Sequence, residues 1–407
     1  MPSDPSSRHT SGFKEQTSLA DAQERLFDNI RPIDRTEHVS LAAADGRILA
    51  EPIVANRDVP HYRRAAMDGY AVQASDTFGA TSRSPAVLSE DEEMGTGTAV
   101  RVHTGSPVPD EANAVVKIEE VNVIGNTIEV NTPVAESENV APVGEDVTAG
   151  QQLFDAGHQL RPSDLGLLQS IGLTRVSVYD TPTVGVIPTG DELVQQDPQK
   201  GEIIETNGLT VSRLVDRWGG ISTYRDPVSD DKDALRAAIQ RDLTKDLIVT
   251  TGGSSVGERD LLPEVVDELG EILVHGVSIK PGHPVALGVV ESTPIIILPG
   301  YPVSCIVNAV QFLRPALKRL VRVSPPDHPT VTATLDRKIS SEPGTRTFAR
   351  VELSDSGDKQ TAIPTRSSGA GVLSSVALAD GWVEVPEAKE GVTAGESVTV
   401  GLWEWLP

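Results

Sequence analysis

The sequence predicts a multidomain α/β plus β protein, in which a domain with a mostly parallel sheet is joined to β-rich domains. The chain has 407 residues, too many for one ordinary hydrophobic core. Residues 182–324 alternate apolar strand patterns with amphipathic helix patterns, as parallel α/β sheets do. Residues 56–149 and 325–407 contain short β-like runs between turn formers, and the second region has the strand spacing of a small barrel or sandwich.

Two helical segments flank the first β-rich region. Residues 1–16 are polar, and we expect a disordered tail there. Capped helices are predicted to begin at Ser18 and at residues 162–164. We expect residues 17–55 and 150–181 to form one discontinuous helical arm, with the β-rich region inserted between its two halves.

The central α/β region contains four strand patterns and four helix patterns. The expected strands are 183–187, 246–250, 272–279 and 294–298, and the expected helices are 207–218, 230–243, 260–269 and 303–321. The carboxyl ends of parallel strands lie along one edge of a sheet, where ligands bind. We therefore expect the loops that follow these strands to form one site.

Composition excludes several classes of protein. The chain has 35 Lys and Arg and 59 Asp and Glu, which gives a formal net charge of −24. This negative charge disfavours binding to nucleic acid or acidic lipid. Because the chain is acidic and 25 of its basic residues are Arg, it is halophile-like. Cys305 is the single cysteine, and neither a membrane-length apolar run nor a signal-peptide pattern is present. We expect a cytoplasmic protein without membrane contact.

Three unusual loops follow predicted strands, at residues 188–193, 250–260 and 298–304. The middle loop has neither the Lys-Ser/Thr of a Walker A motif nor a GxGxxG fingerprint. Closely spaced glycines and hydroxyls still predict a cradle for phosphate, with a tight turn as the alternative. The groups expected to form the cradle belong to Gly252, Gly253, Ser254 and Ser255.

Charged residues accompany these loops. Asp191, Glu192 and Asp260 are candidate ligands for Mg²⁺ against phosphate oxygens, although Asp260 also fits a helix N-cap. Lys280 lies on a Pro/Gly turn between two predicted strands and is a candidate cation for a phosphate or oxyanion. A solvated surface lysine is the alternative, and His283 is either a hydrogen-bond donor or structural.

Two turns in the inserted region carry polar residues that a turn alone does not require. Asp68 precedes Gly69, which also fits an Asx turn, and Thr104 lies in a second turn dense in Gly and Pro. Cys305 begins a predicted helix without an evident partner base, which favours a structural role.

Taken together, eight motifs resemble the MoeA family, the molybdopterin molybdenumtransferases that include the gephyrin E domain. In chain order they are AAMDGYAV, VHTGSPVP, VGEDV, PTGDEL, ETN, TGGSSVGERD, IKPGHPVALG and LPGYPVS, and the resemblance spans about residues 17–404.

The resemblance implies four parts: an elongated arm, an inserted β-rich domain, a molybdopterin-binding α/β domain and a C-terminal β barrel. It also implies a homodimer whose cleft combines the α/β domain of one subunit with the inserted domain of the other. In such a cleft, Asp68 and Thr104 of one chain would face Glu192 and Asp260 of the second.

The implied reaction joins molybdate to adenylylated molybdopterin, with Mg²⁺-dependent release of AMP. The implied catalytic residues are Asp68, Thr104, Glu192, Asp260 and Lys280. The implied binding residues for the pterin, the nucleotide and molybdate are Thr189, Gly190, Asn207, Thr251, Gly252, Gly253, Ser254, Ser255, His283, Pro299, Gly300, Tyr301, Pro302 and Arg350. Expected metal ligands are Glu192 and Asp260, with Asp230 and Asp231 in reserve.

Some positions depart from the family pattern. His283 stands where a second Lys or Arg is frequent, Ala370 replaces a usual Ser, and Glu205 replaces the Asp of DTN. Residues 141–143 replace a basic stretch. These changes leave open a tungstate-preferring paralogue or a weakened, molybdopterin-binding scaffold, and a molybdopterin adenylyltransferase is a further alternative. The adenylyltransferase and apo-molybdoenzymes are candidate partners.

Overall fold

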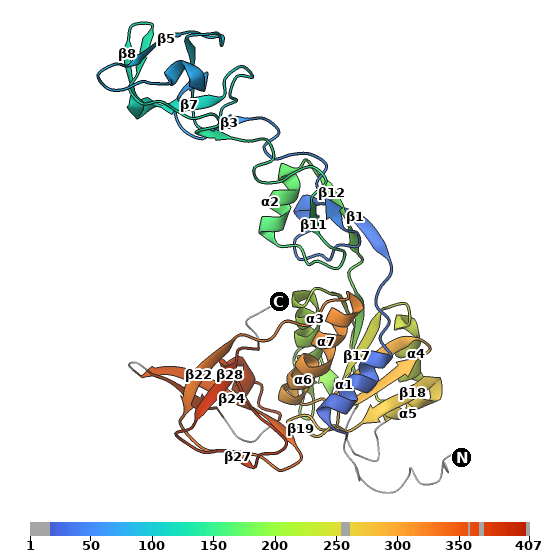
Figure 1. Cartoon of the computed structure of the whole chain (residues 1–407). Coiled ribbons are helices and arrows are strands. Elements are labelled where there is room, and N and C mark those ends of the chain that lie inside the picture. The colour runs from blue at the N-terminus through green and yellow to red at the C-terminus, as the bar shows by residue number, and fades with distance from the viewer. Residues whose placement is uncertain (1–16, 254–260, 357–358, 366–369, 404–407) are drawn as a thin grey trace. The chain divides into compact units, whose positions relative to one another are not determined.

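The structure is a computed structural model that describes residues 17–253, 261–356, 359–365 and 370–403 (Figure 1). The chain divides into two compact units. We call the described parts of Met1–Thr36 and Tyr179–Pro407 the terminal unit, and Glu37–Val178 the inserted unit.

A six-stranded sheet forms the centre of the terminal unit, in the order β16-β13-β17-β21-β20-β18. Its strands are β13 (Thr183–Pro188), β16 (Ile221–Tyr224), β17 (Leu247–Thr251), β18 (Gly270–His275), β20 (Ala286–Val290) and β21 (Thr293–Leu298). The pairings from β16 to β21 are parallel, whereas β20 is antiparallel to both of its neighbours. The prediction of a mostly parallel sheet is confirmed, although β16 and β20 were not expected.

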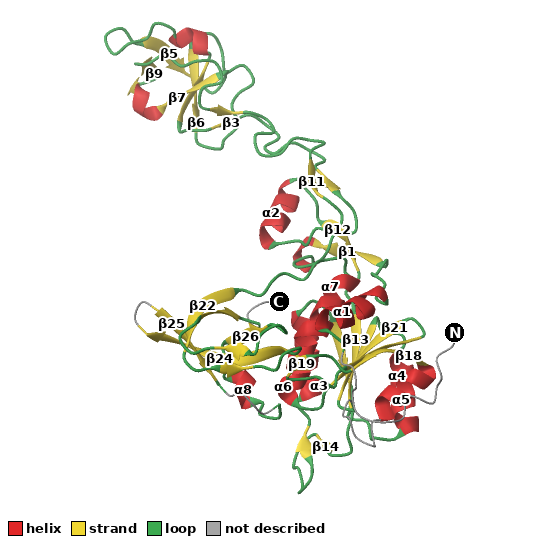
Figure 2. Cartoon of the chain, turned by 60° about the horizontal axis from the view of Figure 1, so that its bottom comes forward, coloured by secondary structure: helices red, strands yellow, loops and turns green. Residues whose placement is uncertain are grey.

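Helices cover both faces of this sheet, as Figure 2 shows. They are α1 (Leu19–Asp28), α3 (Asn207–Arg217), α4 (Lys232–Asp242), α5 (Leu261–Leu269), α6 (Pro302–Asn308) and α7 (Arg314–Leu320). A π-helix, Ala309–Leu313, joins α6 to α7 inside the segment predicted as one helix. Alternate residues of β21 enter different cores: Ile296 packs with α3, α6 and α7, and Ile297 packs with α4 and α5. Strands covered on both faces read as continuous apolar runs, which is why the sequence predicts them.

The helix α1 packs within the terminal unit. Residues up to Thr36 belong to that unit, whereas residues 17–55 were expected to be part of the arm. Leu19, Ala22 and Leu26 lie on one side of α1 and are buried in the core shared with the α/β sheet. An amphipathic helix must bury its apolar face, but its periodicity does not identify the surface that receives it.

A closed barrel follows the α/β domain. Its five strands are β22 (Thr330–Leu335), β24 (Arg346–Ser356), β25 (Lys359–Pro364), β26 (Gly381–Val385) and β28 (Ser397–Gly401). They pair in the order β24-β25-β22-β28-β26, and β24 pairs with β26 to close the ring. Of the barrel and sandwich predicted, the barrel is correct. Short β19 (Ile279–Lys280) of the α/β domain adds to β24 in parallel.

The inserted unit has its own six-stranded sheet, in the order β7-β4-β6-β5-β9-β8. These strands are β4 (Gly69–Val72), β5 (Ala86–Glu90), β6 (Thr98–Val102), β7 (Ala114–Lys117), β8 (Val121–Ile124) and β9 (Thr127–Val130). A separate core contains Leu49 and Leu168 and brings together chain from before and after this sheet. It includes α2 (Pro162–Ser170).

Short ribbons complete the fold. They are β1 (Thr36–Ser40) with β12 (Arg175–Tyr179), β2 (Ile53–Val54) with β11 (Gln152–Phe154), β3 (Arg64–Ala65) with β10 (Val140–Ala141), β14 (Leu193–Val194) with β15 (Ile203–Ile204), and β23 (Ile339–Ser340) with β27 (Gly391–Val392). A one-turn helix, α8 (Ser374–Ala377), precedes β26.

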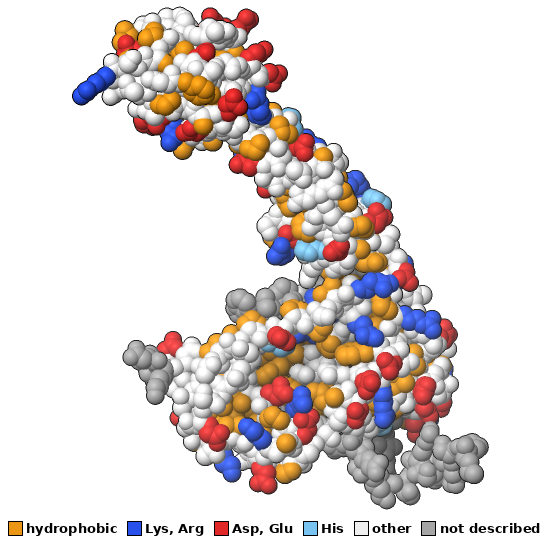
Figure 3. All heavy atoms as spheres, in the orientation of Figure 1, with side chains coloured by type: hydrophobic (Ala, Val, Ile, Leu, Met, Phe, Trp, Pro, Cys, Tyr) orange, Lys and Arg blue, Asp and Glu red, His pale blue; other side chains and the backbone are white. Residues whose placement is uncertain are grey.

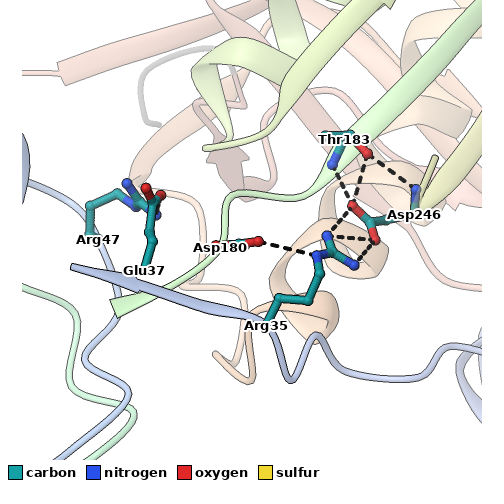
Figure 4. Close-up of polar contacts among 6 residues, drawn as sticks. All are labelled: Arg35, Glu37, Arg47, Asp180, Thr183 and Asp246. Carbon is teal, nitrogen blue, oxygen red and sulfur yellow. Dashed lines mark hydrogen bonds and ion pairs between the residues drawn. The ribbon is translucent and has the colours of Figure 1, made fainter. Parts of the chain in front are cut away.

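An ion-pair network holds the chain near the ends of β1 and β12 (Figure 4). Arg35 donates from Nε to Asp180 at 3.1 Å and from Nη2 to Asp246 at 3.0 Å. The backbone N–H and hydroxyl of Thr183 donate to Asp246 at 2.8 and 2.9 Å. Charged hydrogen bonds of this kind are stronger than neutral ones, so the network fixes both segments to the start of β13.

The surface agrees with the acidic composition. Figure 3 shows Asp and Glu side chains distributed over both units. None of the helices in the described ranges is long and apolar enough to cross a membrane.

Candidate active site

A large pocket in the terminal unit lies where the sequence predicts a site. Its volume is about 1310 Å³, and residues that follow β13, β17 and β21 line it together with residues of the barrel. The three predicted loops therefore converge, because the carboxyl ends of these parallel strands share one edge. Glu192 and Lys280, which come from distant parts of the chain, line the same pocket.

The floor of the pocket has the features of an anion cradle. Gly252 has φ +122°, and a Cβ atom there would lie 2.3 Å from the carbonyl oxygen of Thr189, so only glycine fits. The hydroxyls of Thr189 and Thr251 are buried and have no hydrogen-bond partner among the described residues. Buried hydroxyls without partners cost stability, so these two are suited to a bound polar group. Ser254 and Ser255 lie outside the described residues.

Carboxylates are among the residues that line the pocket. Glu192 and Asp230 line it, and the Asp230 N–H donates to Asp191 Oδ1 at 3.1 Å. Burial, followed by the negative charges of Asp191 and Glu192, raises the pKa of Asp230. Such crowding favours a cation, and Mg²⁺ commonly uses one or two carboxylates together with substrate phosphates. Glu192 and Asp230 fit that pattern, although the described residues hold no group of three potential metal ligands.

The other two metal candidates have different outcomes. The Asp231 carboxylate caps α4, since it accepts from the N–H groups of Asp233 at 3.1 Å and Ala234 at 2.9 Å. This use of the carboxylate makes Asp231 a helix cap, as an Asp directly before a helix often is. Asp260 lies outside the described residues.

Basic groups also line the pocket. Lys280 Nζ donates to Glu342 Oε1 at 2.7 Å, and the Lys280 side chain remains half-exposed. Arg350 comes from β24 of the barrel, and burial lowers its pKa, although arginine remains charged. Burial also lowers the pKa of His283, which favours the neutral form of the ring. Lys280 and Arg350 therefore bring two basic side chains to the lining of the pocket, and His283 adds an imidazole.

Asn207 and its neighbours connect α3 to the loop after β21. Asn207 Nδ2 donates to the carbonyl of Gly300 at 2.7 Å. Glu205 is buried and accepts from the Gly208 N–H at 2.6 Å and from the Tyr224 hydroxyl. Burial and the bond to Glu205 raise the pKa of Tyr224 to about 12, which keeps its hydroxyl a donor. The Glu205–Tyr224 pair orders the segment that presents Asn207.

Further residues that the sequence analysis expects to bind ligand also line the pocket. They are Gly190, Gly253, Pro299, Tyr301 and Pro302. Tyr301 is 66% exposed, whereas Cys305 is completely buried and its pKa is raised by that burial. The buried thiol agrees with the structural role predicted for Cys305.

Asp68 and Thr104 form a pair within the inserted unit. Asp68 Oδ1 accepts from the Thr104 N–H at 2.6 Å and from its hydroxyl at 2.9 Å. These bonds lower the pKa of Asp68, the backbone bond being the larger cause. The sequence analysis identifies both residues as candidates but does not predict the hydrogen bonds between them. Their expected position opposite Glu192 and Asp260 in a dimer stays a prediction.

Comparison with known proteins agrees with this arrangement. Family models described as "MoeA N-terminal region (domain I and II)", "Probable molybdopterin binding domain" and "MoeA C-terminal region (domain IV)" match residues 17–172, 185–319 and 332–403. The chain belongs to the MoeA family. The family predicted from the eight motifs is thereby confirmed.

Relatives of this MoeA protein match it along nearly its full length. A putative molybdopterin biosynthesis protein of Methanocaldococcus jannaschii is 37% identical, over 93% of this chain and 95% of the relative. The molybdopterin molybdenumtransferase of Haemophilus influenzae is 31% identical, over 94% and 98%. The crystal structure of the molybdopterin biosynthesis MoeA protein of Pyrococcus horikoshii OT3 superposes with a TM-score of 0.81 at 33% identity, over 95% of this chain and 100% of that chain. The prediction of a transferase enzyme of molybdenum cofactor biosynthesis agrees with these relatives.

Proposed function

We propose that this MoeA protein transfers molybdenum from molybdate to adenylylated molybdopterin and releases AMP. The observation that carries the proposal is that one pocket is lined by two carboxylates, Glu192 and Asp230, and by two basic side chains, those of Lys280 and Arg350. An adenylylated pterin carries phosphates that attract a divalent cation, and molybdate is an oxyanion that needs positive charge. A pocket of about 1310 Å³ has room for both.

In this proposal, the acidic and the basic residues of the pocket bind different groups. Glu192 and Asp230 would hold Mg²⁺ against the phosphates, where the ion would neutralise negative charge and polarise the phosphorus–oxygen bonds. Gly252 and the hydroxyls of Thr189 and Thr251 cradle a phosphate. Lys280 and Arg350 bind the oxyanion and hold it near the pterin. The chemistry at the dithiolene belongs to the substrate.

The first test compares two pairs of substrates. Purified protein should release AMP when given adenylylated molybdopterin, Mg²⁺ and molybdate, and should not consume ATP when given molybdopterin. Formation of adenylylated molybdopterin from ATP would overturn the proposal in favour of an adenylyltransferase.

The proposal includes a homodimer in which Asp68 and Thr104 of a second copy complete the site. Asp68→Ala and Glu192→Ala proteins should each be inactive. Mixed dimers, formed by co-expression with two different affinity tags, should regain activity in one of their two clefts. Inactive mixed dimers, or an active monomer, would contradict a shared cleft.

One observation favours a variation on this function. Burial lowers the pKa of His283, so this imidazole is a weaker source of positive charge than the Lys or Arg that is frequent at that position. We therefore propose a direct comparison of molybdate with tungstate in the AMP-release assay. A lower KM for tungstate would identify a tungstate-preferring paralogue, and pterin binding without AMP release would identify a scaffold.

A further inference from the structure

A buried asparagine at the end of α6 contacts the turn that carries Lys280. Asn308 is the last residue of α6 and is completely buried. The π-helix begins at the next residue, and such irregularities occur frequently at functional sites. Asn308 does not line the pocket, and neither its position nor its residue type singles it out in the sequence.

The Asn308 side chain joins two segments that do line the pocket. Its Nδ2 group donates to the carbonyl of Gly282 at 3.0 Å and to the carbonyl of Ser304 at 2.8 Å. Gly282 follows Lys280 by two residues in the turn, and Ser304 belongs to α6. Both Gly282 and Ser304 line the pocket. One amide group therefore fastens the Lys280 turn to the helix that follows the Gly300 loop.

The fit around this amide is close and oriented. Gly282 has φ +113°, and a Cβ atom there would lie 2.0 Å from Asn308 Nδ2. Turning the amide over would place Oδ1 against two carbonyl oxygens, so only the orientation with Nδ2 toward them makes hydrogen bonds. The missing side chain of Gly282 is thus what allows the amide to reach the turn.

The turn is held at its other end by the barrel. Lys280 pairs with Thr347 of β24, and its ammonium group contacts Glu342. These contacts fix the backbone of Lys280 on the barrel side, and Asn308 fixes the turn on the α/β side. The Gly282 carbonyl also accepts from the Val285 N–H at 3.3 Å, so loss of the amide would loosen the turn without leaving that oxygen unpaired.

We propose that Asn308 is a positioning residue that sets the place of Lys280 for binding the oxyanion. This inference rests on the proposed function of Lys280. A small displacement of a binding group lowers affinity for the group it binds, whereas steps that do not involve that group are preserved. Asn308 thereby acts through Lys280, without touching the substrate.

The principal test compares Asn308→Ala with a matched control. Val307→Ala removes volume from the neighbouring, fully buried position of α6 and leaves the amide intact. We expect Asn308→Ala to raise the KM for molybdate about five- to tenfold, as for loss of a buried hydrogen bond, with kcat changed much less. Val307→Ala should lower the thermal midpoint and leave this KM unchanged. Lys280→Met should raise it more than Asn308→Ala does.

The three variants separate the two proposals. If Lys280→Met leaves the KM for molybdate unchanged, the proposed role of Lys280 is wrong, and the role of Asn308 is wrong with it. If Lys280→Met raises the KM but Asn308→Ala behaves as Val307→Ala does, only the inference about Asn308 is overturned.

Asn308→Asp gives a second readout that a purely structural role would not move. A protonated Asp can donate one hydrogen bond to the carbonyls, whereas the ionised form can donate none. Burial raises the pKa of such a carboxyl, so the donor is present at low pH and lost as pH rises. The KM of this variant for molybdate should therefore rise with pH relative to the wild type. If the ratio of the variant's KM for molybdate to that of the wild type did not change with pH, the proposal would be contradicted.

Discussion

Acidic residues of the terminal and inserted units have opposite surroundings. In the terminal unit, Asp230 lies beside Asp191 and Glu192, and this crowding together with burial raises its pKa. In the inserted unit, Asp68 receives two hydrogen bonds from Thr104, and its pKa is lowered. Carboxylates that repel one another are suited to a cation from outside the chain, whereas a carboxylate with donors is already satisfied. The pattern of partners therefore separates candidate metal ligands from fixed acceptors more sharply than the residue type does.

The largest expected effect comes from removing one charge from the group of neighbouring carboxylates in the terminal unit. Glu192→Gln keeps the size of the side chain but loses the charge that would hold Mg²⁺. We expect the kcat for AMP release to fall about 100-fold, since the ion contributes several kcal/mol to stabilising charge in such reactions. Binding of AMP in the absence of Mg²⁺, measured by calorimetry, should remain. An unchanged kcat would remove Glu192 from the mechanism.

A second prediction concerns Glu342, the carboxylate that accepts a hydrogen bond from the pocket residue Lys280. Its bond with Lys280 lowers its pKa, and a bound oxyanion must compete with it for the ammonium group. Glu342→Gln should lower the KM for molybdate about two- to fivefold, because exposed ion pairs are weak. Glu390→Gln is the matched control, since it removes an exposed charge of the same barrel, whereas the described ion pair of Lys280 is with Glu342. Equal effects of both substitutions would indicate only a change in the overall field.

A third prediction tests the repulsion at Asp230 in the absence of substrate. Because its pKa in the folded protein is raised, its stabilising contribution is present below the ordinary pKa of Asp and is lost as pH rises through the raised value. Asp230→Asn should therefore raise the thermal midpoint at pH 7 by roughly 1 to 2 °C. It should also reduce the further increase produced by MgCl₂, compared with NaCl at equal ionic strength. If Asp230→Asn had a lower thermal midpoint than the wild type without Mg²⁺, the proposed repulsion at Asp230 would be contradicted.

The smallest expected effect is on the local structure of the turn at Asp68, where the sign of the pH dependence is reversed. Its pKa is lowered, so its contribution is present above the ordinary pKa of Asp and is lost as pH falls through the folded value. Asp68→Asn should speed exchange of the Thr104 amide hydrogen at neutral pH, and the difference from wild type should shrink in acid. Equal exchange in both proteins, after correction for intrinsic rates, would mean that the carboxylate does not hold this turn.

The site was predictable where local pattern and topology act together. The apolar runs of β13, β17 and β21 identify strands, and parallel pairing then brings their loops to one edge. Asp231 shows what this reasoning misses. Its position beside the site made it a candidate metal ligand, but the structure shows that its carboxylate caps the first turn of α4.

Other features depend on contacts between distant segments. Asn308, Glu342 and Tyr224 acquire their roles from partners that are remote in the chain, and no local pattern marks them. The placement of α1 has the same cause, because its apolar face is visible in the sequence and its partner surface is not. The strands β16 and β20 were not predicted from the local pattern, and their pairing with neighbouring strands in the completed sheet identifies them.

The pairing of β19 with β24 has a consequence for protein engineering. Lys280 of the α/β domain and Arg350 of the barrel belong to segments joined through one hydrogen-bonded ladder, so the pocket's positive charge spans a domain boundary. A chimera that exchanges the barrel between relatives must preserve the backbone register of Ile279 and Lys280 with the incoming strand. The barrel is thus an integral wall of the active site, and it cannot be swapped as an independent module.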